Sequence, residues 1–184
     1  MSSNNFLIRK AKEKDLKNIM EIVKSCIQNL ILKNIFQWND NYPSLNNFKE
    51  DITKDNLYLL IIQDKIVIGC FSINYKMDNF YKNINWISPN EKNLYVHRLA
   101  IEPSFQNKGY GQLIMAFIEE KAISENCDSI RLDTFSLNKI NNLFYEKIGF
   151  YKIGTIYFPD QSEFPFNCYE KPLKKLKLNH KLLT

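Results

Sequence analysis

The stretch from Leu94 to Phe135 constrains the fold more than any other part of the chain. It opens with an apolar, β-branched run (Leu94–Ile101), passes through a turn that holds two glycines, and continues as an apolar helical segment. A second strand-like run, Ser129–Phe135, follows. A strand, a helix and a second strand in this order form a βαβ unit. The pattern therefore predicts an α/β protein with its ligand beside this unit.

The segments on either side of this unit extend the same architecture. Apolar residues at helical spacing between Leu16 and Leu30 predict an amphipathic helix, and a shorter helix is expected within Leu45–Asp55. Another helix is expected over Asn138–Lys147, with Gly149 as its C′ residue. Further strands are expected at Phe6–Lys10, Leu57–Ile62, Ile66–Tyr75, Phe150–Phe158 and Phe166–Leu173.

The order of these elements predicts a mixed sheet with helices on its faces. The chain has 184 residues and shows no internal repeat or domain boundary, so we expect a single domain over residues 1–173. A basic, leucine-containing tail, residues 174–184, follows it. The polar segment Met77–Asn93 is expected to be a loop or a partly ordered excursion.

Gly109 and Gly111 stand at the start of the central helix. The first amides of a helix have no intrahelical acceptor and lie at the positive end of the helix dipole, so a phosphate or pyrophosphate is the expected ligand. Glycine lets the chain turn sharply and lets a ligand approach the backbone, and Lys108 adds a positive charge. The spacing matches neither the dinucleotide-binding fingerprint nor a Walker A loop, so a plain tight turn is the alternative.

Composition argues against several classes of protein. No apolar run reaches the ~18–20 residues that span a bilayer, and the N-terminus is too polar for a secretory signal, so we expect a cytoplasmic protein without a membrane partner. The four cysteines form no C-x-x-C pair, which favours free thiols. The net charge of +5 suits an anionic ligand or weak nucleic-acid binding, but no RNP-like or helix-turn-helix pattern supports the latter.

Two motifs, read together, resemble those of one enzyme family. The segment VHRLAIEPSFQNKGYGQLIMAFIEEKA is similar to motif A of the GNAT superfamily, the acyl-CoA-dependent N-acetyltransferases, with Gln106, Gly109 and Gly111 at the motif's positions. Downstream, NKINNLFYEKIGF (residues 138–150) resembles motif B of the same family, at the expected distance. Asn141 departs from that motif, because a smaller residue is usual there.

The resemblance implies the GNAT fold, a mixed, mostly antiparallel central sheet with helices on both faces. It also implies acetyl-CoA as the acyl donor, without a metal. Leu99 and Ile101 would pair their backbone with the pantetheine arm, and the Leu99 amide would polarise the thioester carbonyl. Asn138 would bind the arm from the opposite side of the cleft, beside Tyr145. The residues whose amides would hold the pyrophosphate are Gln106, Asn107, Lys108, Gly109, Tyr110 and Gly111.

Tyr145 is the general acid that the resemblance implies. A tyrosine has a pKa of about 10, so it is protonated at neutral pH and can donate to the departing thiolate, whose pKa is near ~8.5. A tyrosine that packs and hydrogen-bonds without taking part in chemistry is the alternative.

The acceptor amine must lose a proton, because an alkyl amine with a pKa near 10.4 is almost entirely protonated at pH 7. His97 stands two residues before Leu99 and shares its face in a regular strand, so it is the candidate base, with Tyr95 as a relay. A histidine lodged in the sheet is the alternative. Arg98 is expected to face the other way, as a structural residue or on the acceptor side of a bulge.

The function that follows is transfer of an acetyl group to a primary amine of a small molecule or peptide. Trp38, Tyr42 and Trp86 are candidates for lining the acceptor cleft, with core packing as the alternative. A catalytically silent acyl-CoA sensor or interaction domain is the alternative function. The presence of both Tyr145 and Asn138 argues against it. The mildly basic composition gives no special reason to expect a cationic acceptor. Homodimers are common in the family, and nothing in the sequence requires one.

Overall fold

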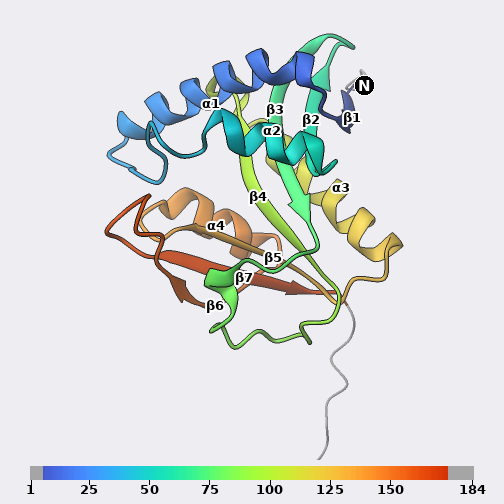
Figure 1. Ribbon diagram of the computed structural model, residues 1–184, viewed down its shortest axis with the longest axis vertical. Helices are drawn as coiled ribbons and strands as arrows, with labels where there is room; N and C mark the ends of the chain where they lie inside the picture. Colours follow the sequence, from blue (N-terminus) through green and yellow to red (C-terminus); the bar gives the residue numbers. More distant parts are fainter. Residues whose placement is uncertain (1–5, 174–184) are drawn as a thin grey trace, which may run out of the picture.

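The computed structural model describes residues 6–173 (Figure 1). The predicted tail, residues 174–184, lies outside them. The helices are α1 (Leu16–Ile31), α2 (Leu45–Thr53), α3 (Tyr110–Ser124) and α4 (Lys139–Lys147). The strands are β1 (Phe6–Lys10), β2 (Leu57–Ile62), β3 (Ile66–Asn74), β4 (Asn93–Ile101), β5 (Ser129–Phe135), β6 (Tyr151–Ile156) and β7 (Phe166–Pro172). Each helix and strand expected from the sequence is present, with bounds that differ by a few residues at most.

The seven strands form one sheet in the order β1-β2-β3-β4-β5-β7-β6. β4 and β5, which α3 connects, run parallel, and every other neighbouring pair is antiparallel. The predicted mixed, mostly antiparallel sheet and its central βαβ unit are therefore confirmed.

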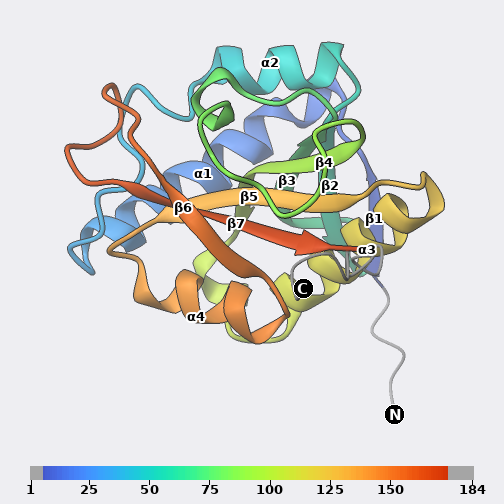
Figure 2. The ribbon, with the colours of Figure 1, turned by 90° about the horizontal axis from the view of Figure 1, so that it is seen from below.

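Helices cover both faces of the sheet. Figure 2 shows α1 and α2 on one face and α3 and α4 on the other. β2 is buried on both sides, because alternate residues of a strand point to opposite faces. Its residues Leu57, Leu59 and Ile61 pack with α1, whereas Tyr58 and Leu60 belong to the cluster that contains α3. Within residues 6–173, none of the helices has the length and apolarity needed to cross a membrane.

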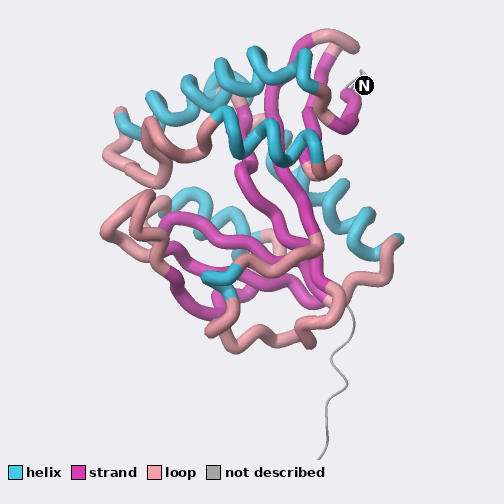
Figure 3. The backbone as a smooth tube through the Cα atoms, viewed as in Figure 1, coloured by secondary structure: helices cyan, strands magenta, loops and turns pink. Residues whose placement is uncertain are grey.

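The sheet splits between β4 and β5. Their parallel pairing runs from Asn93 opposite Ser129 to Val96 opposite Leu132 and then ends, although both strands continue. Figure 3 shows strands β1–β4 and strands β5–β7 leaving this junction in different directions. His97 and Asp133 are the first residues beyond the last pair, so both stand where the split opens.

A bulge in β4 lies at the same place. Cys70 and Ser72 of β3 pair with Ala100 and His97, so β4 has one residue more than β3 over this stretch. Arg98 has a φ of 51°, which is a left-handed conformation. The strand is thus irregular where the sequence alone assumed a regular alternation.

The segment between β3 and β4 is held more firmly than a polar loop requires. It contains a 3-10 turn (Asn79–Tyr81), and Tyr81 is fully buried. Arg131, also fully buried, donates to the Ser88 carbonyl at 2.6 Å and pairs with Glu170 at 3.0 Å. Trp86 covers the Arg131 guanidinium at 4.6 Å from its ring centroid. These contacts anchor the segment to β5 and β7.

Candidate active site

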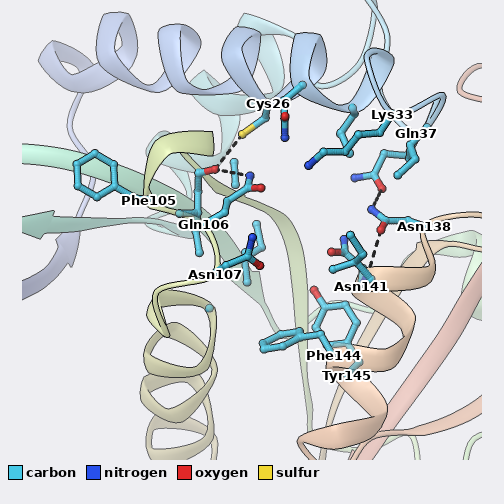
Figure 4. Close-up of a pocket in the computed structure, with 18 of the residues that line it drawn as sticks. Cys26, Lys33, Gln37, Phe105, Gln106, Asn107, Asn138, Asn141, Phe144 and Tyr145 are labelled. Carbon is cyan, nitrogen blue, oxygen red and sulfur yellow. Dashed lines mark hydrogen bonds between the residues drawn. The ribbon is translucent and has the colours of Figure 1, made fainter.

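Two cavities occupy the split in the sheet. The first, about 480 Å³, lies between the glycine turn, the end of β4 and α4 (Figure 4). The second, about 340 Å³, lies between the bulge of β4, the end of β5 and the segment that follows β3. The two cavities meet, because they share the lining residues Gln37, Trp38, Leu99, Asn141 and Tyr145.

The two glycines of the turn are needed for different reasons. Gly109 has a φ of 86°, and a Cβ there would meet only Gln112 Oε1, at 4.0 Å. Glycine is therefore favoured at this position by the backbone conformation and not by a lack of space for a side chain. Gly111 is helical, but a Cβ there would lie 3.3 Å from Cζ of Phe144. Its missing side chain lets α3 approach Phe144 of α4 closely.

The start of α3 presents free backbone amides to the first cavity. The first intrahelical bond runs from the Leu113 amide to the Gly109 carbonyl, at 3.1 Å. The amides of Tyr110, Gly111 and Gln112 precede it and have no acceptor within the helix. Asn107 and Gly109 both have positive φ, and successive amides in such a turn form a concave anion-binding surface.

Gln106 shapes this turn from the inside. Its backbone amide donates to the Pro103 carbonyl at 3.2 Å, and its side-chain amide donates to the Ile101 carbonyl at 2.8 Å. The Cys26 thiol also reaches the Ile101 carbonyl, at 3.2 Å, and Figure 4 shows both groups converging on it. The backbone amide of Gln106 was expected to bind a phosphate, but it already donates to Pro103. The carbonyl of Ile101, expected to pair with the pantetheine arm, already accepts two hydrogen bonds.

Lys108 and Tyr110 line neither cavity. Lys108 Nζ lies 5.2 Å from the centroid of the Phe105 ring, and Tyr110 packs edge-on against the same ring. The basic residues that do line the first cavity are Lys33 and Lys147, and no carboxylate in residues 6–173 accompanies them. This cavity is therefore suited to an anion.

Asn138 caps α4 and joins it to the segment after α1. Its side-chain oxygen accepts from the Asn141 amide at 3.2 Å, and its side-chain nitrogen donates to Gln37 Oε1 at 2.8 Å. Gln37 and the neighbouring Trp38 line both cavities. The buried Asn138 lines the first cavity, and it also holds the wall between the two in place.

Tyr145 stands where the two cavities meet. Its ring packs against Phe144, Phe150 and Tyr169, and only 7% of the residue is exposed. Within residues 6–173, its hydroxyl has no protein hydrogen-bond partner; Figure 4 shows it directed into the first cavity, away from α4. Burial, and to a smaller degree the charge of Asp133, raises the pKa of Tyr145 above its usual value.

Around the bulge of β4, His97, Arg98 and Leu99 all line the second cavity. The guanidinium of Arg98 forms a two-pronged pair with the buried Asp51, at 2.8 Å for each bond, and donates to the Tyr42 hydroxyl at 3.2 Å. Arg98 thus lies on the side of the bulge that faces the second cavity. Tyr42, which was predicted to line an acceptor cleft, lines this cavity.

His97 faces the second cavity beside Tyr81, with the two rings nearly parallel and their centroids 6.4 Å apart. Burial, helped by the charge of Arg98, lowers the pKa of His97 to about 3. The imidazole is therefore neutral at pH 7, and it is a weak base. Tyr95, the expected relay, lies against Arg131, 3.2 Å from its Nη1, and lines neither cavity.

Asp133 is the residue that sequence reasoning missed. It accepts a hydrogen bond from the Tyr81 hydroxyl and lines the second cavity. Burial raises the pKa of Asp133 from 3.8 to about 6, although the hydrogen bond from Tyr81 acts in the opposite direction. The available signal was an acidic residue within the otherwise strand-like SIRLDTF, but nothing local shows that it stands at a split in a sheet.

Trp86 does not reach the site. It covers Arg131 and donates from Nε1 to the Tyr81 carbonyl at 3.2 Å, so it belongs to the anchor of the segment between β3 and β4. Trp38 and Tyr42 are brought to the second cavity, whereas Trp86 lines neither. In residues 6–173, no three His, Cys, Asp or Glu side chains come together as metal ligands would.

Cys26 is the one cysteine among the lining residues of either cavity within residues 6–173. Burial raises the pKa of Cys26 to about 12, so it is a thiol at neutral pH, and its hydrogen goes to the Ile101 carbonyl. A protonated, hydrogen-bonded thiol is a poor nucleophile. The geometry therefore argues against Cys26 as a nucleophile.

The fold has clear counterparts among solved structures. An acetyltransferase from Staphylococcus aureus Mu50 superposes with a TM-score of 0.70 at 28% identity, over 91% of this chain and 99% of that one. A GNAT-family acetyltransferase from Streptococcus agalactiae 2603 superposes with a TM-score of 0.78 at 22% identity, over 92% and 96%. The NatC complex, bound to Gag peptide and CoA, includes a chain that matches with a TM-score of 0.61 at 18% identity, over 92% and 99%.

The sequence has no significant match among curated proteins. The model of the acetyltransferase (GNAT) family, in contrast, matches residues 7–150. This match covers most of the described fold, including the split in the sheet, the glycine turn and α4. The chain therefore belongs to the GNAT acetyltransferase family.

Proposed function

We propose that this protein transfers an acetyl group from acetyl-CoA to a primary amine. The observation that carries the proposal is the junction of the two cavities at Leu99 and Tyr145. A thioester entering from the first cavity and an amine entering from the second would meet there, beneath one free hydroxyl.

The first cavity suits the donor. CoA carries phosphates and a long, flexible arm, and the cavity offers free amides at the start of α3, two lysines and no carboxylate among the described residues. The NatC complex, whose fold this chain shares, has been crystallised with CoA. In this chain the amides of Asn107 and of Gly109–Gln112 would hold the phosphates, while Gln106 keeps the turn in shape through its bond to Ile101.

Leu99 and Tyr145 would act on the reacting group. The amide of Leu99, at the bulge, would donate to the thioester oxygen as charge develops there. Tyr145 would then give its proton to the departing sulfur. Its raised pKa keeps it protonated throughout the physiological range, and the hydroxyl is not committed to another group of the protein.

Acetyl-CoA binding and turnover are tested separately. The unfolding temperature should rise when acetyl-CoA or CoA is added, since a ligand at 100 times its Kd adds about 2.7 kcal/mol of stability. Release of free CoA thiol, followed across a panel of primary amines, then tests transfer. Stabilisation without thiol release for every amine would identify a sensor, and the absence of both would contradict the proposal.

A further inference from the structure

Asp133 is placed by the topology at the opening of the split. It follows Leu132, the last residue of β5 that pairs with β4, and it still pairs with Cys168 of β7. On the side where β4 has parted, it lines the second cavity. The hydrogen bond from the Tyr81 hydroxyl fixes the carboxylate without neutralising its charge. Asp133 forms no ion pair within the described residues, since Arg98, the nearby cation that lowers its pKa, is paired with Asp51. Withdrawing a carboxylate from water without an ion-pair partner is costly, so such a group is rarely kept without a reason.

The charges around the second cavity do not cancel. Arg98 is the one Lys or Arg among its lining residues within the described chain, and Asp51 already pairs with it in two-pronged fashion. Asp78, the other carboxylate of the lining, is exposed and caps the 3-10 turn through the Phe80 amide. The cavity therefore carries excess negative charge, concentrated at Asp133, while the chain as a whole has a net charge of +5.

We propose that Asp133 binds the ammonium group of the acceptor and removes a proton from it, which makes cationic alkyl amines the acceptor class. This inference rests on the proposed function. It adds a residue that chooses the acceptor and prepares it for attack.

The transfer balances when Asp133 acts with Tyr145. The acceptor binds as R–NH3+ and gives one proton to the Asp133 carboxylate. The electron pair released on nitrogen forms the C–N bond, and the C–S bond breaks as sulfur takes the proton of Tyr145. A second proton leaves the nitrogen and restores Tyr145, while Asp133 gives its proton to solvent. The net products are an amide, free CoA thiol and one proton.

Asp133 is better suited to this step than His97. Both line the second cavity, but the pKa of His97 is lowered to about 3, whereas the pKa of Asp133 is raised to about 6. An alkylammonium has a pKa near 10.4, so the carboxylate is much the closer match and the stronger base. It also attracts the cation electrostatically, which a neutral imidazole does not. The titratable and charged groups around Asp133 are Tyr81, Asp78, Arg98, His97, Tyr42, Tyr145 and Cys168.

The decisive experiment compares Asp133→Asn with the unchanged protein on two probes, 1,4-diaminobutane, which is cationic at pH 7, and aniline, which is not. We expect kcat/KM for the diamine to fall about 100-fold and that for aniline to fall less than about 5-fold. The thermal shift with acetyl-CoA should be retained, because Asp133 does not line the first cavity. Asp64→Asn, in the turn between β2 and β3, is the matched control and should leave both values unchanged.

The pH dependence gives a second readout. For the diamine, kcat/KM of the unchanged protein should rise with pH through an apparent pKa of about 6, as the Asp133 carboxylate forms. Asp133→Asn should remove this limb. Tyr81→Phe removes a hydrogen bond that lowers the pKa of Asp133, so it should move the limb to higher pH while the protein stays folded and active.

The outcomes separate the two proposals. An unchanged protein that neither responds to acetyl-CoA nor releases thiol with any amine overturns the proposed function. An active protein in which Asp133→Asn affects both probes equally, or neither, overturns only the role of Asp133. Turnover of aniline without turnover of the diamine, or a retained acid limb, does the same.

Discussion

The two cavities that meet at Tyr145 differ in charge and in the way the chain builds them. In the first cavity, the wall that would hold phosphates comes from one continuous segment, which runs from β4 through the glycine turn to α3. Within the described part of the chain, the charged residues that line this cavity are two lysines. The second is assembled from the ends of β4 and β5, the segment after β3 and the segment after α1, and Asp133 dominates its charge. The comparison teaches that net charge describes neither cavity, because a basic protein can enclose an acidic pocket.

Gly109→Asp should have the largest effect, because it changes the first cavity at the turn that we propose holds the phosphates. It introduces a negative charge and a side chain at a φ of 86°, so kcat/KM should fall at least about 1000-fold (~4 kcal/mol) and the thermal shift with acetyl-CoA should vanish. Gly109→Asn is the matched control, since asparagine tolerates this conformation and carries no charge. Equal losses in both variants would point to backbone geometry instead of charge.

Asp133→Asn should have the next largest effect, this time on stability. A carboxyl whose pKa is raised from 3.8 to about 6 by folding penalises the folded state once it ionises, by up to about 3 kcal/mol above pH 6. The variant should therefore be more stable than the unchanged protein at pH 8. It should lose this advantage below pH 4, where the Asp133 carboxyl of the unchanged protein becomes protonated in the folded and the unfolded state alike. Urea unfolding at the two pH values measures this, and an advantage independent of pH would contradict the assignment.

Tyr145→Phe tests the group that both cavities share. It should lower kcat for the diamine about 100-fold (~2.7 kcal/mol) while the stabilisation by acetyl-CoA stays, because only the hydroxyl is removed. Phe144→Leu, on the preceding position of α4, serves as a packing control. Unchanged turnover in Tyr145→Phe would remove the acid role from Tyr145.

His97→Asn should have the smallest effect. If His97 only packs beside Tyr81 in the second cavity, kcat/KM should fall less than about 10-fold (~1.4 kcal/mol), and the limb near pH 6 should remain. A loss as large as that of Asp133→Asn, with the limb gone, would return the base role to His97 and reverse the comparison between the two residues.

Much of the first cavity was readable from the chain itself. Gly109 and Gly111 stand three and five residues after Gln106, and the turn, the helix and the motif after Asn138 all follow from local order. The finer geometry was not readable. The amide of Gln106 is bound to Pro103, and Lys108 lies over Phe105 instead of facing the cavity, because a short 3-10 turn, Pro103–Phe105, precedes the glycines.

Most of the second cavity could not be predicted from the sequence. Trp38, Tyr42 and Trp86 were expected near an acceptor, and Trp38 and Tyr42 do line this cavity. Trp86 instead packs over the buried Arg131, which is 45 residues further along the chain. His97 was placed on the same face as Leu99 on the assumption of a regular strand. The bulge at Arg98 breaks that alternation, and His97, Arg98 and Leu99 all line the second cavity.

The sequence by itself determined the elements, their order and the position of the glycine turn, because each depends on periodicity, glycine positions and helix ends within a few residues. Only the tertiary structure decided where β4 and β5 part, and therefore that His97 and Asp133 face one cavity. The physical reason is that burial and charge at that point come from segments far apart in the chain. The pKa of Asp133 and the electrostatic preference of the second cavity depend on those neighbours, and they exist only once the sheet is assembled.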